Sequence, residues 1–142
     1  MAKTGSNYTL GRDERIKSRK LIESLFKDGT AFNQFPYRVL YRFTGNSARP
    51  LQAGFAVSSR NFKKAVDRNR IKRLTREAYR LQKPALKSLA AEQNAGLAVF
   101  FIYTGKELPD FETVVKKTGL ILEQLITLVK ENAATGRAGN GR

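Results

Sequence analysis

The residues that could carry out chemistry in this chain are concentrated between positions 60 and 83. This stretch contains ten lysines and arginines but only two acids, Asp67 and Glu77. Arginine predominates, and its planar guanidinium group can form two parallel hydrogen bonds to a phosphate. Cations at this density repel one another unless an anion neutralises them. The pattern predicts a surface that binds phosphates.

Composition excludes most catalytic centres built from protein side chains. The 142 residues include no cysteine and no histidine, so zinc sites made of these residues, thiolate nucleophiles and serine–histidine pairs are excluded. The 12 acids are scattered, and Asp13 with Glu14 is the only adjacent pair. A stand-alone metal-dependent nuclease needs clustered carboxylates to hold its ions. We therefore expect no catalytic residues in the protein itself.

The whole chain is strongly basic, with 27 lysines and arginines and a formal net charge of +15. Such a charge favours a polyanionic partner: nucleic acid, an anionic membrane surface or an acidic protein. The longest apolar run, residues 97–103, has seven residues, whereas a membrane-spanning helix needs about 20. The N-terminus lacks the apolar stretch of a secretory signal. We expect a cytoplasmic protein that does not bind membranes.

The chain is expected to form a single domain over residues 12–131. Residues 1–11 are polar and residues 132–142 are rich in glycine and alanine, which predicts a flexible lead-in and a disordered tail. Between them, apolar residues recur with helical or strand periodicity. The predicted elements are a helix at 13–27, strands at 35–43, 53–58 and 97–103, a basic helix ending at 82 and a long helix after Asp110.

This order of elements favours an α+β sandwich, with helices packed on a mostly antiparallel sheet. The strands at 35–43 and 53–58 follow each other closely, so we expect them to pair antiparallel. Residues 97–103 are apolar on both faces, which is typical of a central strand. The basic helix should end before Pro84, because proline disfavours a helical residue just ahead of it.

The basic helix is predicted to have two faces. At about 100° per residue, an apolar stripe forms from Ile71, Leu74, Ala78 and Leu81. The opposite arc carries the cations Arg68, Lys72, Arg73, Arg76 and Arg80. The helix should therefore dock by one side and offer guanidinium groups on the other.

The strand at 35–43 carries an aromatic face that has two interpretations. Phe35 and Phe43 are expected to belong to the core. Tyr37 and Tyr41 could also be core, but aromatic rings beside arginines are equally suited to stacking on unpaired bases. Composition leaves both interpretations open.

The motif in the basic helix resembles a known family. Arg68-Asn69-Arg70, followed by Lys72-Arg73 and then Arg76, is similar to the RNRxKRxxR signature of the bacterial ribonuclease P protein subunit. The similarity extends to residues 54–57 and 25–29 and covers about residues 12–130 in matching order. The resemblance implies a basic accessory to a catalytic RNA, and together they remove the 5′ leader from precursor tRNA.

The resemblance also implies a fold and a cofactor. The fold is a two-layer sandwich of a mostly antiparallel four-stranded sheet with three helices in the order αβββαβα. It resembles the ribosomal protein S5 domain 2-like fold, with a left-handed crossover. Divalent metal (Mg²⁺) is required by the holoenzyme, with none bound tightly to the protein. The partners are the catalytic RNA and precursor tRNA, and no DNA is expected.

Site residues follow from the same resemblance. The leader would lie in a cleft between the first helix and the sheet, formed by Phe26, Val39, Tyr41, Arg60, Arg68, Asn69, Lys72 and Arg76. The catalytic RNA would contact Arg70 and Arg73. Two positions depart from the family pattern: Ile22 replaces an aromatic residue, and Ser59 with Arg60 replaces a pair of lysines. One stacking contact and one charge of the cleft are affected.

A ribosomal or other structural RNA-binding protein would share this size, this charge and the lack of catalytic groups. The RNA that co-purifies with the protein distinguishes the two interpretations, because it would be ribosomal in one case and the ribonuclease P RNA in the other.

Overall fold

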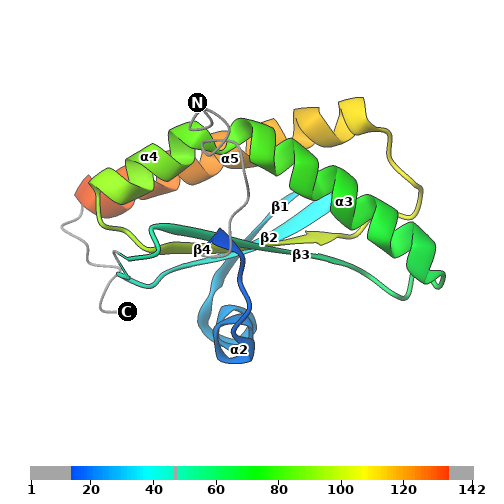
Figure 1. Ribbon diagram of the computed structural model, residues 1–142, viewed down its shortest axis with the longest axis horizontal. Helices are drawn as coiled ribbons and strands as arrows, with labels where there is room; N and C mark the ends of the chain where they lie inside the picture. Colours follow the sequence, from blue (N-terminus) through cyan, green and yellow to red (C-terminus); the bar gives the residue numbers. More distant parts are fainter. Residues whose placement is uncertain (1–13, 47, 135–142) are drawn as a thin grey trace, which may run out of the picture.

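A four-stranded sheet divides the molecule and carries helices on both faces (Figure 1). The structure is a computed structural model that describes residues 14–46 and 48–134. In chain order its elements are α2 (Arg19–Asp28), β1 (Thr30–Gln34), β2 (Tyr37–Phe43), β3 (Leu51–Val57), α3 (Ala65–Gln82), α4 (Pro84–Glu92), β4 (Leu97–Tyr103) and α5 (Phe111–Ala134). The α+β class is as predicted.

The sheet is mixed, with strand order β1-β2-β4-β3. β2 pairs antiparallel with β1 and with β4, while β3 pairs parallel with β4. The predicted pairing of strands 35–43 and 53–58 is wrong, because β4 lies between β2 and β3. The strand that is apolar on both faces takes the central place, as predicted for 97–103. The handedness of the β3-to-β4 connection stays a prediction.

The described residues form four helices where three were expected. Pro84 ends α3 as predicted, but it also begins α4, because proline is well tolerated in the first turn of a helix. α2 begins at Arg19 instead of residue 13, since the Ser18 side chain caps it by accepting from the Leu21 amide. α5 follows Asp110 as predicted and continues through Ala134, past the predicted domain end at 131. The predicted lead-in and the rest of the predicted tail lie outside the described residues.

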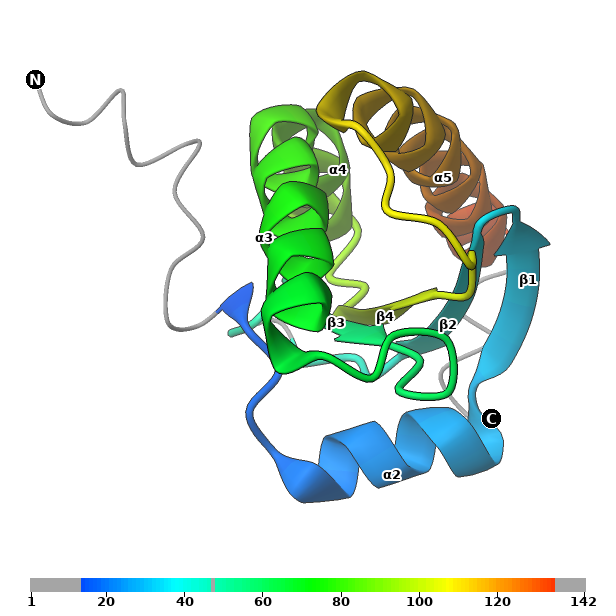
Figure 2. The same ribbon diagram turned by 90° about the vertical axis from the view of Figure 1, so that its right-hand side faces the viewer.

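The helices lie on both faces of the sheet. α3, α4 and α5 cover one face, and α2 is the only helix of the described residues on the other (Figures 1 and 2). The large core lies under α3–α5, where Phe101 is 1% exposed and its ring packs on those of Phe55 and Tyr79. Tyr37 is also buried there and is hydrogen-bonded to Thr75 of α3 at 2.7 Å.

The smaller core lies under α2 and is built from Leu25, Leu40, Ala98 and Phe100. Gly54 of β3 leaves room for it, because a Cβ atom there would lie only 2.5 Å from the Phe100 ring. The two cores are separated by the sheet, since successive side chains of a strand point to opposite faces.

Two residues expected to be buried are exposed. Phe35 is 74% exposed because it lies in the turn between β1 and β2, outside either strand. Leu81 is 44% exposed, since the buried side of α3 is formed by Ile71, Thr75, Ala78 and Tyr79. Phe43 is partly buried and packs against the large core, as expected.

Candidate nucleic-acid interface

A groove runs between α2 and the ends of β3 and β4, with a volume of about 900 Å³. We call it the α2 groove. One wall is Phe26 of α2, and another is the loop after β3, which carries Ser59 and Arg60. Ile102 and Lys106 complete it from β4 and the segment that follows. The groove therefore combines an aromatic ring with two cations, Arg60 and Lys106.

Phe26 is presented by the amphipathic pattern of α2. Leu25 is completely buried against the sheet, whereas the next residue, Phe26, lies at the margin of the buried side and is 57% exposed. Its ring meets the Phe100 ring edge-on, with 5.6 Å between centroids and 69° between planes. This contact supports the Phe26 side chain while much of its ring stays exposed to solvent. An exposed ring in a supported position can stack on an unpaired base.

A second, basic pocket of about 400 Å³ lies between α3 and the start of β3. We define the basic pocket by the polar side chains that line it: Arg15, Asn69, Lys72, Arg73 and Arg76. The four residues from α3 are the neighbours Lys72 and Arg73 with Asn69 and Arg76 three or four positions away, so they lie on one side of the helix beside the edge strand. None of the described residues that line this pocket is acidic, so it is suited to phosphate.

The two hollows follow each other along β3. The basic pocket is lined by Ala53, Gly54 and Phe55, and the α2 groove begins at the next residue, Ala56. β3 is an edge strand, with α3 on one side of the sheet and α2 on the other (Figure 2). A single extended strand of nucleic acid could follow this edge from cations to an aromatic ring.

Arg15 reaches the basic pocket because its neighbours are fixed. The Ile16 amide donates to the Ala53 carbonyl at 3.1 Å. The Glu14 carboxylate is hydrogen-bonded to Lys83, which is completely buried, and to Lys87 at 2.5 Å. Burial alone would raise the pKa of Glu14, but the hydrogen bonds from both lysines outweigh it and lower the pKa. This segment thus closes part of the β3 edge.

The predicted leader residues fall into separate places. Phe26 and Arg60 line the α2 groove, while Asn69, Lys72 and Arg76 line the basic pocket. Arg68 lines neither of these hollows. It is half-buried, and its Nη1 donates to the carbonyls of Phe62 and Lys63 at 2.8 and 2.9 Å, which fixes the loop before α3.

The structure does not bring Val39 and Tyr41 to Phe26. Val39 is completely buried in the large core, and Tyr41 packs against the same core on the α3–α5 face. Its ring contacts Phe32 and Phe43, each at 6.0 Å between centroids, and burial raises its pKa. The strand residue that faces α2 is Leu40. Placing Val39 and Tyr41 in a cleft with the first helix is therefore wrong.

The two residues predicted to contact the catalytic RNA are separated as well. Arg70 is exposed and does not line the basic pocket, whereas Arg73 lines it beside Lys72 and Arg76. Arg80 is paired with Glu77 at 2.6 Å, and this hydrogen bond lowers the pKa of Glu77.

Sequence reasoning missed several residues of these hollows. Arg15 lies in a separate basic stretch near the N-terminus and Lys106 is an isolated lysine, and neither belongs to the pattern of the basic helix. Ile102, which lines the α2 groove, and Phe100, which supports Phe26, lie in a strand that is apolar on both faces, and its sequence does not indicate which face is thinly covered.

Within residues 14–46 and 48–134, no three histidine, cysteine, aspartate or glutamate side chains gather as a group that could hold a metal ion. Over the same ranges, no helix has the length and apolar character needed to cross a bilayer.

A family model described as Ribonuclease P matches residues 10–126 of the chain. The chain belongs to the ribonuclease P protein family. The ribonuclease P protein component of Porphyromonas gingivalis is 40% identical over 111 residues, which cover 77% of this chain and 80% of the relative. The corresponding component of Chlorobium phaeobacteroides is 31% identical over 128 residues, covering 82% and 88%. The predicted family is thereby confirmed.

Solved structures agree with this assignment. The ribonuclease P protein of Thermotoga maritima superposes with a TM-score of 0.60 at 27% identity, over 78% of this chain and 96% of that one. The Staphylococcus aureus protein has the same fold, with a TM-score of 0.57 at 19% identity over 82% and 95%. As a ribonuclease P protein, the chain is a subunit of a ribonucleoprotein endonuclease that acts in tRNA 5′ maturation, and its partner is the ribonuclease P RNA.

Proposed function

We propose that the protein binds the single-stranded 5′ leader of precursor tRNA along the edge of β3. In this proposal the α2 groove receives a base against Phe26, and Arg60 neutralises a neighbouring phosphate. Asn69, Lys72, Arg73 and Arg76 bind further phosphates in the basic pocket. The observation that carries the proposal is the exposed Phe26 ring, supported by Phe100, at the end of a path lined by cations.

We assign the outer side of α3, with Arg70, to the catalytic RNA. Arg70 is exposed and lies off the basic pocket, so one helix can contact the leader on one side and the catalytic RNA on the other. This division supports a subunit that holds substrate and ribozyme together. Divalent metal is then required by the holoenzyme and not held tightly by the protein, and neither DNA nor membrane is a partner.

The experiment is a comparison of holoenzyme with the catalytic RNA alone. Dissociation constants are measured for precursor tRNAs whose leaders are extended one nucleotide at a time, and for mature tRNA, at fixed salt and magnesium. The protein should raise affinity more as the leader lengthens and should add almost nothing for mature tRNA. An equal gain for mature tRNA contradicts leader binding.

Two further measurements bear on the same proposal. The protein without RNA should not cleave precursor tRNA at any magnesium concentration, because it has no histidine and no carboxylate cluster among its described residues to activate water. The RNA that co-purifies from its own cells should be the ribonuclease P RNA. Ribosomal RNA in its place would favour a structural role.

A further inference from the structure

Three connections are tied together at one end of the sheet, beside the α2 groove. Asn61, in the loop after β3, donates through Nδ2 to the carbonyls of Thr104 and Gly105 at 3.1 and 3.3 Å. Thr104 donates to the carbonyl of Pro36, from its amide at 2.7 Å and from Oγ1 at 3.0 Å. The β1–β2 turn, the β3–α3 loop and the β4–α5 connection therefore form one hydrogen-bonded scaffold.

Each part of this scaffold holds an exposed side chain in place. Arg60 precedes Asn61, Lys106 follows Gly105, and Phe35 precedes Pro36. Phe35 is 74% exposed, more than any other large apolar side chain in the described part of the chain. The scaffold holds Phe35 at the edge of a hollow although Phe35 itself contributes little to the core, so its ring is accessible to a ligand there.

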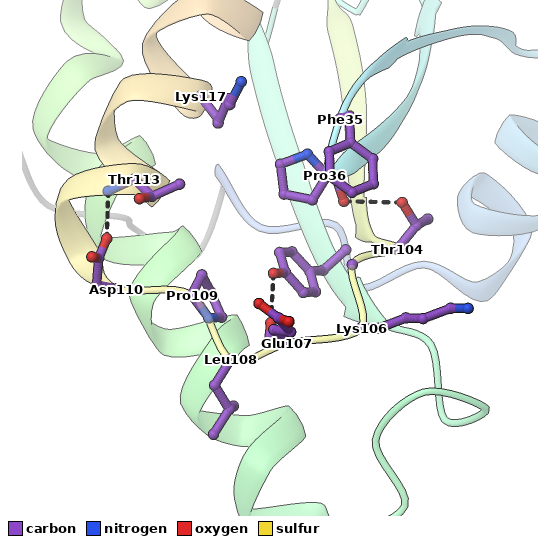
Figure 3. A pocket seen from close by; sticks show the side chains of 12 residues that line it. Phe35, Pro36, Thr104, Lys106, Glu107, Leu108, Pro109, Asp110, Thr113 and Lys117 are labelled. Carbon is purple, nitrogen blue, oxygen red and sulfur yellow. Dashed lines mark hydrogen bonds between the residues drawn. The ribbon is translucent and has the colours of Figure 1, made fainter.

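Beside Phe35 lies a hollow of about 780 Å³, bounded by the β1–β2 turn, the β4–α5 connection and the first turns of α5 (Figure 3). The connection is packed closely: a Cβ atom at Gly105 would lie 2.7 Å from Tyr103 Oη, which donates to the Glu107 carbonyl at 2.8 Å. We call this hollow the Phe35 pocket. It shares Thr104 and Lys106 with the α2 groove, so the two hollows adjoin at these residues.

The lining of the Phe35 pocket suits a base better than a phosphate. Its walls are largely apolar, and its two acids, Glu107 and Asp110, are matched by two lysines, Lys106 and Lys117. Asp110 also accepts from the Thr113 amide at 2.8 Å as the cap of α5. The pocket therefore has no excess of positive charge to attract a phosphate into it. Lys106, at the rim shared with the α2 groove, suits the phosphate of that nucleotide.

We propose that the Phe35 pocket receives an unpaired leader nucleotide beyond those in the α2 groove. The base stacks on Phe35 within the pocket, and Lys106 contacts its phosphate. Lys106 thus gives the α2 groove a second cation besides Arg60, whose neighbour Ser59 carries no charge. The inference rests on the proposed function, because it extends the path of the same leader.

The test uses Phe35→Ala holoenzyme with precursor tRNAs of increasing leader length. Stacking of one base on an aromatic ring corresponds to a loss of about fivefold or more in affinity. This loss should appear only when the leader is long enough to leave the α2 groove, and Phe35→Trp should restore binding. Leu120→Ala removes a side chain that is 40% exposed on α5, away from these hollows, and serves as the matched control.

An abasic scan of the leader identifies the stacked base. One abasic position should lower the affinity of the wild-type holoenzyme but have no further effect on Phe35→Ala. Equal losses for short and long leaders, no loss with any leader, or full additivity at every abasic position each overturn the inference. Phe26→Ala is measured in parallel. If its loss depends on the leader while that of Phe35→Ala does not, the Phe35 pocket is excluded and the proposed function stands.

Discussion

Phe100 and Phe101 are neighbours in β4, yet they belong to opposite faces of the sheet with different coverage. Phe101 is 1% exposed and is enclosed by aromatic rings beneath α3–α5. Phe100 is 8% exposed under α2, where it belongs to the smaller core and also contacts the exposed ring of Phe26. One face is therefore closely packed, whereas the other is thinly covered and is the face on which we propose that RNA binds.

The dimensions of the elements explain the difference. A helix is about 10 Å wide, whereas strands of seven residues are about 23 Å long. α2 crosses the strands at a large angle, so a single helix leaves roughly half of their length without a helical cover (Figure 2). Three helices cover the opposite face. The α2 groove is the uncovered end of the thinly covered face.

The largest expected effect is a loss of stability on substitution in the face that α3–α5 cover. Phe101→Ala should lower the free energy of unfolding by about 3–5 kcal/mol, because it removes a buried aromatic ring and leaves a cavity. Phe26→Ala, on the other face, should change it by less than about 1 kcal/mol, since the ring is 57% exposed. Urea unfolding followed by circular dichroism measures both. Similar losses for the two variants would remove the distinction between the faces.

The next effect concerns the segment that closes the β3 edge. Glu14→Gln should lower the free energy of unfolding by about 3 kcal/mol at neutral pH, because Lys83 remains completely buried without its carboxylate. The double variant Glu14→Gln with Lys83→Met removes both charges and should recover part of the loss.

The same pair predicts a pH dependence. The pKa of Glu14 is lowered on folding, so its stabilising contribution is present above the ordinary value of 4.5 and is lost as the pH falls through the folded-state pKa. Wild-type stability should therefore fall more steeply below pH 4.5 than that of Glu14→Gln. Parallel acid profiles would show that the carboxylate contributes nothing.

Much of the fold could be predicted because its signals are local. The apolar run of β4, proline at position 84 and the Asp110 cap each mark an element or its boundary without reference to the rest of the chain. The missed features are long-range. β4 takes its place between β2 and β3 only after the chain has passed through α3 and α4. Its partners are therefore far away in the sequence, and no local pattern predicts the pairing.

The candidate site illustrates the same limit. Alternation in β2 correctly places Val39 and Tyr41 on one face, but it does not say whether α2 or α5 covers that face. A strand pattern identifies which side chains lie together, and only tertiary packing assigns them to the core or to the groove. Helical spacing was more informative, since Asn69, Lys72 and Arg76 do line one pocket.

For leader-dependent RNA affinity we expect the opposite order from that for stability: a substitution on the α2 face should have the larger effect. Phe26→Ala should cost about 1–3 kcal/mol in affinity for precursor tRNA, the range for one lost stacking contact, and almost nothing for mature tRNA. Tyr41→Ala should lower the melting temperature, because Tyr41 packs against the large core, and any loss of affinity should be equal for the two RNAs. Filter binding with the holoenzyme, beside melting curves, tests both. A leader-dependent loss for Tyr41→Ala would return that residue to the binding surface.

The smallest expected effect separates the basic pocket from the outer side of α3. Lys72→Gln and Arg76→Gln should each reduce the slope of log K against log salt for leader binding by about 0.7, the value for one phosphate of a single strand. Arg70→Gln, which lies off the basic pocket, should leave that slope unchanged and instead weaken assembly with the catalytic RNA. Lys116→Gln, exposed on α5, is the matched control for loss of a charge and should alter neither quantity. If Arg70→Gln reduced the leader slope as much as Lys72→Gln, the leader would contact the whole arc of α3, and the division of this helix between two RNAs would be wrong.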